Sequence, residues 1–261
     1  MTVSAVIPCY RCADTVRRAA LSVAAQAERP LELILVDDAS DDGTPQTLAE
    51  LQAELGASWV QIITLNRNGG AAAARNAGWN AARGTYVAFL DADDSWLPAK
   101  TQRQRAFMDR RAEFSISGHL ASYAGLSPSS QEEEFREITR RMVLLKNPMV
   151  TPSFMVRRDL PIRFDAQSRY MEDHRFLQEA VYSGLRVARL KDVLAVVHKP
   201  AYGRGGLSAR LWPMERGELD NYRTLRRAGW IRPAAHWLLV AYSLAKFCRR
   251  ITMVGLRRLV R

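Results

Sequence analysis

The chain has 261 residues, 48% of them hydrophobic, which is long enough for one large domain with a sizeable core. Three cysteines, an odd number, cannot close a disulfide framework, so we expect a reducing compartment. Cys9 and Cys12 form a CxxC, but the second pair that a zinc site needs is missing. The net charge of +11 divides into −4 for residues 1–100, +7 for 101–210 and +8 for 211–261, which disfavours a uniformly basic nucleic-acid-binding module.

Strands and helices alternate regularly in the first hundred residues. Four short apolar runs predict buried strands, at 3–7, 31–36, 60–65 and 86–90. The segments between them predict helices, at 15–26 with Asp14 as N-cap, at 44–55, and at 71–83 with Gly84 as C-cap. Short loops between alternating strands and helices predict a parallel sheet with right-handed crossovers.

The pattern is less regular beyond residue 100. We expect helices at 97–111, 132–145, 172–183, 212–228 and 234–248. Strands are expected at 114–123, 187–190 and 194–198, a strand-pair edge at 147–158, and loops at 125–131 and 202–207. The chain then divides into a first half of one domain at 1–98, its second half at 99–210, and a basic helical appendage at 211–261.

Three carboxylates follow the strand at 86–90 within four residues: Asp91, Asp93 and Asp94. Open α/β sheets bind ligands at the carboxyl ends of their strands. Mg²⁺ and Mn²⁺ prefer oxygen ligands, and Mg²⁺ is often held by one or two carboxylates together with substrate phosphates. The segment therefore indicates a site for a metal-bound diphosphate, and the alternative is a polar turn that caps the next helix.

Five motifs occur in an order that resembles the family 2 glycosyltransferases, which are inverting enzymes with the GT-A fold. They are the VIPCY at 6–10, the ELILVDDASDDGT at 32–44, the NGG at 68–70 with ARN at 74–76, the DADD at 91–94 and the Glu-Asp at 172–173. The resemblance covers about residues 2–210. It implies an α/β GT-A fold with a mostly parallel sheet flanked by helices, followed here by a C-terminal helical appendage.

The resemblance implies a set of donor-binding residues. Pro8 and Tyr10 line the nucleobase pocket, and Asp38 accepts a hydrogen bond from the uracil N–H. Asp91 reaches the ribose or the metal, and Asp93 is the direct metal ligand, with Mn²⁺ or Mg²⁺ as cofactor. Three further residues belong to the same site: Asn68, Gly69 and Arg75. A strand-end aromatic, polar turns and a solvated arginine are the alternatives for these positions.

The resemblance also implies the acceptor side of the site. Asp173 is the general base that removes the proton of the acceptor hydroxyl, and Glu172 is its neighbour in the acceptor pocket. His198 follows an apolar strand and completes the metal site. Arg204, in the glycine-rich loop at 202–208, contacts the diphosphate from a lid. First-turn acids that stabilise the helix dipole are the alternative for Glu172 and Asp173. A hydrogen-bonded histidine at a strand end is the alternative for His198, and an ordinary flexible connection is the alternative for the loop that carries Arg204.

Two departures from the family pattern refine the expected reaction. Arg11 stands where the family commonly has asparagine, which changes the hydrogen bonds of the first loop. The chain has no Gln-x-x-Arg-Trp motif, which separates it from processive synthases and favours the addition of a single sugar. We expect a UDP-sugar donor and a carbohydrate or lipid-linked acceptor, in bacterial surface polysaccharide assembly.

The C-terminal segment 234–261 holds six Lys/Arg and no Asp/Glu. Its bulky apolar residues fall on a stripe made of Trp237, Leu238, Tyr242, Leu244, Phe247 and Ile251. Such a basic amphipathic helix is typical of a segment on a membrane surface, which places the enzyme at the inner face of the cytoplasmic membrane. A stripe packed on the domain, or on a second subunit of a homodimer, is the alternative.

No signal peptide or membrane span is expected. The first residues lack a basic leader before an apolar run, and the charge-free part of the C-terminal segment, residues 234–245, has 12 residues where a span needs about 20. Two other functions compete with sugar transfer. A nucleotidyltransferase would need a glycine-rich loop where residues 8–12 have none, and a basic membrane- or nucleic-acid-binding module conflicts with the acidic first hundred residues.

Overall fold

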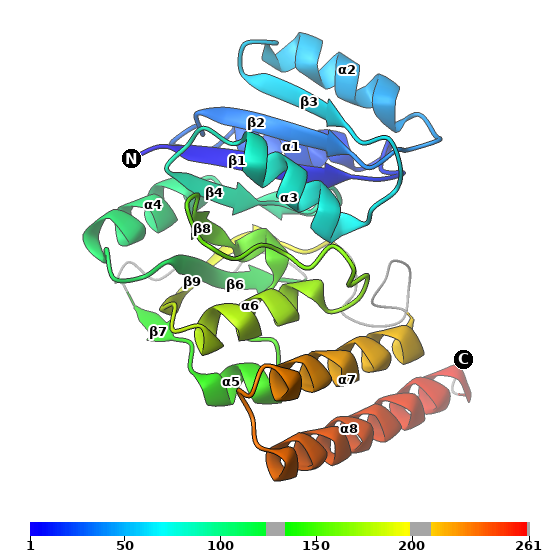
Figure 1. Cartoon of the computed structure of the whole chain (residues 1–261). Coiled ribbons are helices and arrows are strands. Elements are labelled where there is room, and N and C mark those ends of the chain that lie inside the picture. The colour runs from blue at the N-terminus through cyan, green and yellow to red at the C-terminus, as the bar shows by residue number, and fades with distance from the viewer. Residues whose placement is uncertain (124–133, 199–209, 260–261) are drawn as a thin grey trace.

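The computed structural model describes residues 1–123, 134–198 and 210–259. Its first half alternates strands and helices as the sequence predicts (Figure 1). The strands are β1 (Val3–Cys9), β2 (Glu32–Asp37), β3 (Val60–Thr64) and β4 (Tyr86–Phe89). The helices between them are α1 (Val16–Ala24), α2 (Thr44–Leu55) and α3 (Ala71–Ala81).

The second half is less regular and ends in two long helices. Its strands are β5 (Ser95–Trp96), β6 (Ile116–Ser122), β7 (Phe135–Glu137), β8 (Met155–Arg157) and β9 (Val187–Val196). A 3-10 helix covers Thr151–Ser153. The α-helices are α4 (Lys100–Arg110), α5 (Arg140–Leu145), α6 (Glu172–Tyr182), α7 (Leu211–Arg227) and α8 (Pro233–Leu259).

One sheet runs through both halves of the described chain. Its strand order is β3-β2-β1-β4-β8-β6-β9-β5, and β7 also pairs with β9. β1 to β4 pair in parallel, as do β6 and β9, whereas β8 runs antiparallel between β4 and β6. β6 and β9 therefore point in the direction of the first four strands. The mostly parallel sheet with flanking helices confirms the predicted fold class (Figure 1).

The register brings the carboxyl ends of β1, β2 and β4 to one edge of the sheet. Cys9 at the end of β1 lies opposite Asp37 at the end of β2, and the Asp38 amide donates to the Cys9 carbonyl at 2.8 Å. On the other side of β1, Phe89 at the end of β4 lies opposite Val6. The polar residues that follow these strands therefore emerge together, where open α/β sheets bind ligands.

Apolar layers cover both faces of the sheet. On one face, α1 buries four residues at helical spacing: Val16, Ala19, Ala20 and Val23. On the other face, Gly78 lets α3 pack closely on β1, because a Cβ at Gly78 would lie 2.4 Å from Val6 Cγ1. This close packing fixes Arg75, three residues earlier on α3, above the carboxyl edge of the sheet.

Two predictions in the second half are wrong because strand pairing overrides local pattern. The helix predicted at 132–145 is divided: β7 at 135–137 pairs antiparallel with β9, and of the described residues 134–145 only α5 at 140–145 is helical. The Thr139 hydroxyl caps α5 by accepting from the Met142 amide at 3.4 Å. The two strands predicted at 187–190 and 194–198 are one strand, β9, which pairs with β6 between Val187 and Val196 and with β7 at 188–190.

Other predicted positions also change. The segment at 147–158 contributes β8 to the interior of the sheet instead of an edge. The N-cap of α1 is Thr15 rather than Asp14, and α3 ends at Ala81 with Ala82, not Gly84, as its C-cap. Gly84 has another role, since a Cβ there would lie 2.7 Å from the Ser4 amide nitrogen. The loops predicted at 125–131 and 202–207 lie outside the described residues.

Candidate active site

Asp38 organises the loop that follows β3. Its Oδ1 accepts from the Gly69 amide and its Oδ2 from the Gly70 amide, both at 2.7 Å. Gly70 has φ of +86°, a conformation that favours glycine, and a Cβ at Gly69 would lie 2.7 Å from Ala73 Cβ. The predicted uracil acceptor thus first fixes the 68–70 loop, and each carboxylate oxygen keeps a second lone pair for a ligand.

Burial disfavours the ionised form of this aspartate. It raises the pKa of Asp38, which is 2% exposed, and the two glycine amides oppose that rise. The Arg169 guanidinium also lowers the pKa of Asp38, and its Nη2 donates to the Asn68 carbonyl at 3.5 Å. A cation from the segment before α6 therefore reaches the 68–70 loop.

The first loop carries the predicted nucleobase residues. Tyr10 follows β1 and is 44% exposed, so its ring is open to a ligand, and Pro8 lies half-buried at the strand end. Arg11 has φ of +46° and forms two hydrogen bonds of 2.6 Å with the Asp41 carboxylate. Its guanidinium lies 5.4 Å from the centre of the Tyr10 ring. The family departure at Arg11 therefore ties the first loop to the loop after β2.

Arg75 is the central cation of the site. Its Nη2 donates to Asp91 Oδ1 at 2.8 Å and its Nη1 to Glu172 Oε1 at 2.9 Å, while its side chain is only 4% exposed. Burial lowers the pKa of this guanidinium, but the two carboxylates outweigh burial and raise it. The arginine stays charged and joins the end of β4 to the start of α6.

Burial makes ionisation less favourable for both carboxylates that Arg75 contacts. Burial raises the pKa of Asp91 and of Glu172, and in each case Arg75 offsets part of the rise. Repulsion from Asp93 and Glu172 adds to the rise in the pKa of Asp91. Arg75 is therefore what allows the buried Glu172 and the half-buried Asp91 to lie close together.

Asp173 lies one residue into α6, beside this bridge. Its Oδ2 accepts from Asn147 Nδ2 at 2.8 Å, and its Oδ1 accepts from the His174 amide at 2.7 Å. Burial raises the pKa of Asp173, whereas Arg75 and these two hydrogen bonds lower it. A carboxylate that is held in position and has a raised pKa has the properties of a general base.

Asp94 and His198 connect the carboxylate cluster to β9. Asp94 is buried, and its Oδ1 accepts from the His198 amide at 3.2 Å. His198 Nε2 lies 2.9 Å from Ser95 Oγ. Burial and the nearby Arg18 lower the pKa of His198, which keeps its imidazole neutral.

The predicted metal ligands are not grouped as a three-residue site. In residues 1–123, 134–198 and 210–259 no three His, Cys, Asp or Glu side chains are placed to hold one ion. The reason is that Asp91 turns one oxygen to Arg75 and His198 turns Nε2 to Ser95. Arg75 is hydrogen-bonded to Oδ1 of Asp91, and Asp93, two residues further along the chain, is partly exposed.

The segments that form the carboxyl edge of the sheet lie within a region that matches a known protein family. The model of the family described as Glycosyl transferase family 2 matches residues 4–163. The chain belongs to glycosyl transferase family 2. The GT-A fold predicted for such a member is also the fold of its structural neighbours.

Two bacterial relatives carry names from polysaccharide synthesis. The putative teichuronic acid biosynthesis glycosyltransferase TuaG of Bacillus subtilis is 40% identical over 118 residues, which is 45% of this chain and 46% of TuaG. The Escherichia coli UDP-Glc:alpha-D-GlcNAc-diphosphoundecaprenol beta-1,3-glucosyltransferase WfaP is 36% identical over 112 residues, or 43% of each chain. The chain thus spans less than half the length of each relative.

Two solved structures share the fold. S. aureus TarS 1-349 in complex with UDP-GlcNAc has a TM-score of 0.69 at 22% identity, covering 94% of this chain and 72% of that chain. The mannosyltransferase PcManGT from Pyrobaculum calidifontis, in complex with GDP-Man and Mn2+, has a TM-score of 0.69 at 16% identity, covering 99% and 80%. At these identities the likeness establishes the fold alone.

Three residues at this family 2 site were not predicted from the sequence. Asn147 donates to Asp173, Arg169 reaches the 68–70 loop, and Arg18 donates to the Asp93 carbonyl at 2.5 Å. Each comes from a segment distant in sequence from its partner, and none belongs to a motif, so no local signal marks it. Arg204, the predicted lid residue, lies outside the described residues.

Proposed function

We propose that this chain transfers a single sugar from a UDP-sugar to a carbohydrate or lipid-linked acceptor, with inversion at the anomeric carbon. One observation carries the proposal: Arg75 joins the carboxylate at the end of β4 to the first turn of α6, where Asp173 stands. Arg75 therefore connects the acid on the donor side of the site to the helix turn that carries the candidate base. Family membership and the names of the two bacterial relatives support sugar transfer in polysaccharide assembly.

The chain's own residues supply the parts of an inverting displacement. Tyr10 and Asp38 hold the nucleobase side of the donor at the ends of β1 and β2. Asp173 takes the proton of the acceptor hydroxyl while that oxygen attacks the anomeric carbon from the face opposite the departing diphosphate. The Asn147 hydrogen bond orients the Asp173 carboxylate for this step. A single displacement of this kind inverts the configuration.

A divalent cation fits the acidic cluster. Oxygen donors at Asp91 and Asp93 suit Mn²⁺ or Mg²⁺, which keep open positions for substrate phosphates. The cation would be held by Asp91 and Asp93 together with the donor diphosphate, with the neutral His198 nearby. Such an ion, when bound, neutralises the charge that develops on the leaving diphosphate. The Mn2+ in the PcManGT complex supports the same choice of cofactor class.

The surface of α8 supports attachment to the cytoplasmic face of a membrane. The predicted stripe divides in the structure: Phe247 is buried against α7, and the other five residues are exposed, namely Trp237, Leu238, Tyr242, Leu244 and Ile251. No helix among the described residues is long and apolar enough to cross a bilayer. An exposed apolar face near basic residues favours binding on the membrane surface, and a homodimer through the same face is the alternative.

The membrane assignment has a direct test. Full-length protein should co-sediment with anionic vesicles, and Trp237→Glu should reduce that binding without changing UDP affinity. Exposed Leu21 on α1 is a matched control site, and Leu21→Glu should leave vesicle binding unchanged. If the protein is instead a dimer in solution that Trp237→Glu dissociates, the face is a subunit interface and the membrane assignment is wrong.

The test of the reaction separates donor binding from chemistry. Calorimetry with UDP and GDP should give the tighter binding with UDP and Mn²⁺. Hydrolysis of the UDP-sugar, with water as acceptor, should fall by roughly 10²–10⁴-fold in Asp173→Asn, while UDP affinity is unchanged. Asp159→Asn, an exposed acid with no role in the site, is the control. Near-normal turnover by Asp173→Asn would assign the base to another group, and preference for GDP would overturn the donor.

A further inference from the structure

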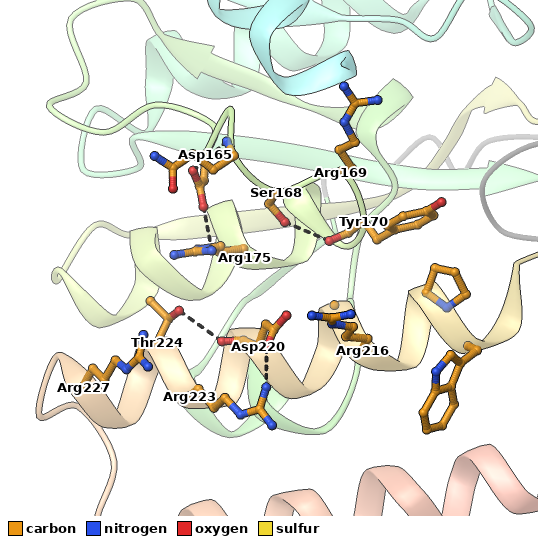
Figure 2. Close-up of a pocket in the computed structure, with 14 residues that line it drawn as sticks. Asp165, Ser168, Arg169, Tyr170, Arg175, Arg216, Asp220, Arg223, Thr224 and Arg227 are labelled. Atoms are coloured by element: carbon orange, nitrogen blue, oxygen red, sulfur yellow. Dashed lines mark hydrogen bonds and ion pairs between the residues drawn. The ribbon is translucent and has the colours of Figure 1, made fainter. Parts of the chain in front are cut away.

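A separate cavity lies between the segment before α6 and the helix α7. Its volume is about 800 Å³, and one wall is formed by residues 165–170 with Arg175 of α6 (Figure 2). The opposite wall is one face of α7, because residues 216, 220, 223 and 227 recur at helical spacing. None of these α7 residues belongs to the family motifs at the carboxyl edge of the sheet.

The cavity is lined by an excess of arginine. Arg175 is paired with Asp165 at 2.6 Å, and Arg223 is paired with Asp220 at 2.5 Å. Arg216 and Arg227 line the same wall, and within the described chain neither has an ion-pair or hydrogen-bond partner for its guanidinium (Figure 2). The two acids of the lining are thus already committed, and the cavity presents uncompensated positive charge.

This cavity is held next to the candidate base. Gly217 lets α7 approach the segment before α6, since a Cβ there would lie 2.9 Å from the Tyr170 carbonyl oxygen. The buried Asn221 donates from Nδ2 to the Met171 carbonyl at 3.1 Å. Met171 directly precedes Glu172 and Asp173, so α7 and its arginines are fixed to the turn that positions the base.

A smaller hollow adjoins the arginines on the side of α8. It has a volume of about 340 Å³ and is lined by Trp212, Arg216, Leu219 and Arg223. The Trp212 ring lies 5.3 Å from that of Phe247 on α8, the helix whose outer face is apolar. Arg216 and Arg223 line both spaces. A molecule whose anionic group lies in the larger space can therefore extend an attached apolar chain into the smaller one.

We propose that this cavity binds a phosphate or diphosphate ester of the acceptor, an inference that rests on the proposed sugar transfer. Planar guanidinium groups bind phosphate oxygens in a bidentate manner, and two of them are free of carboxylate partners here. An acceptor held by its phosphate in this cavity extends its sugar past Met171 toward Asp173. The cavity would then select phosphorylated acceptors over neutral sugars.

The test uses inorganic diphosphate and farnesyl diphosphate as probes of wild-type protein saturated with UDP, which blocks the donor site. Calorimetry should detect both probes, and Arg216→Glu or Arg227→Glu should weaken each by about tenfold or more, the range expected for a charged hydrogen bond. Arg158→Glu is the matched control, since Arg158 is exposed and follows β8 at the opposite edge of the sheet. UDP affinity should be equal in all four proteins.

The outcomes separate this inference from the proposed function. No diphosphate binding by UDP-saturated wild type, or an equal loss in Arg158→Glu, overturns the cavity as an acceptor site even if UDP binding and donor hydrolysis are normal. Failure of the wild-type protein to bind UDP would instead refute the proposed function. Farnesyl diphosphate binding tighter than diphosphate assigns a lipid-linked acceptor, and equal affinities assign a soluble phosphorylated one. Arg216→Gln, which adds no negative charge, guards against disruption of α7 as the cause.

Discussion

Replacing Arg75 by alanine removes the buried cation that holds Glu172, which is buried, and Asp91, which is half-buried, together. The guanidinium is 4% exposed and makes two ion pairs, at 2.8 Å with Asp91 and 2.9 Å with Glu172. Removing one member of a buried ion pair typically costs about 3–5 kcal/mol, because the partner stays buried without compensation. At about 2–4 °C per kcal/mol for a domain of this size, the melting temperature should fall by roughly 6–20 °C.

The pH dependence of this loss identifies its cause. Burial already raises the pKa of Asp91 and Glu172, and loss of Arg75 raises both pKa values further. An acid with a raised pKa in the folded protein costs stability only while it is ionised, so the cost disappears as the pH falls through that pKa. The difference between wild type and Arg75→Ala should therefore be largest at about pH 7.5 and shrink toward about pH 5.

Urea unfolding followed by circular dichroism at the two pH values measures this difference. Arg17→Ala is the matched control, because the Arg17–Glu54 pair is 45% exposed on both sides and should contribute less than about 1 kcal/mol at either pH. Adding Glu172→Gln to Arg75→Ala should restore part of the stability. A loss no larger than that of Arg17→Ala, or one that does not diminish at low pH, would refute the role assigned to the bridge.

Three further predictions follow from contacts in the site and core. Asn147→Ala removes a hydrogen bond that lowers the pKa of Asp173, so the acidic limb of the pH profile of donor hydrolysis should move to higher pH. Asp93→Ala should weaken UDP binding in Mn²⁺ but not in its absence, and unchanged affinity with Mn²⁺ would make Asp93 structural. Gly78→Ala should lower the free energy of unfolding by about 1–3 kcal/mol, since its Cβ would lie 2.4 Å from a β1 methyl group. Gly43→Ala, whose Cβ would lie 3.7 Å from its nearest neighbour, should have little effect.

The first half of the fold follows from local sequence. Each strand of the parallel region is a short apolar run, and each helix between them has a buried face that its periodicity predicts, as Val16 and Val23 of α1 illustrate. Short connections leave little choice of topology. The positions of the candidate donor residues after β1, β2 and β4 follow from the same pattern, because parallel strands end at one edge.

The second half depends on partners that local pattern does not reveal. Residues 135–137 form a strand only because β9 lies beside them, although polar residues around them resemble a helix. β8 lies in the interior of the sheet because β4 and β6 both pair with it. In both cases hydrogen bonds to a distant strand outweigh the weak local preference of a short segment.

The site shows the same division between local and distant information. The acids at 91–94 and 172–173 and the arginine at 75 can all be recognised in the sequence as residues able to bind a ligand or take part in catalysis. Their arrangement is not, because Arg75 reaches Asp91 across 16 residues and Glu172 across 97. The sequence therefore determined that these acids and Arg75 gather at the carboxyl edge of the sheet, but not that Arg18, Asn147 and Arg169 join them. Only the tertiary structure decided that one buried guanidinium joins them, since a buried charge takes whichever opposite charge the packing of distant elements brings within reach.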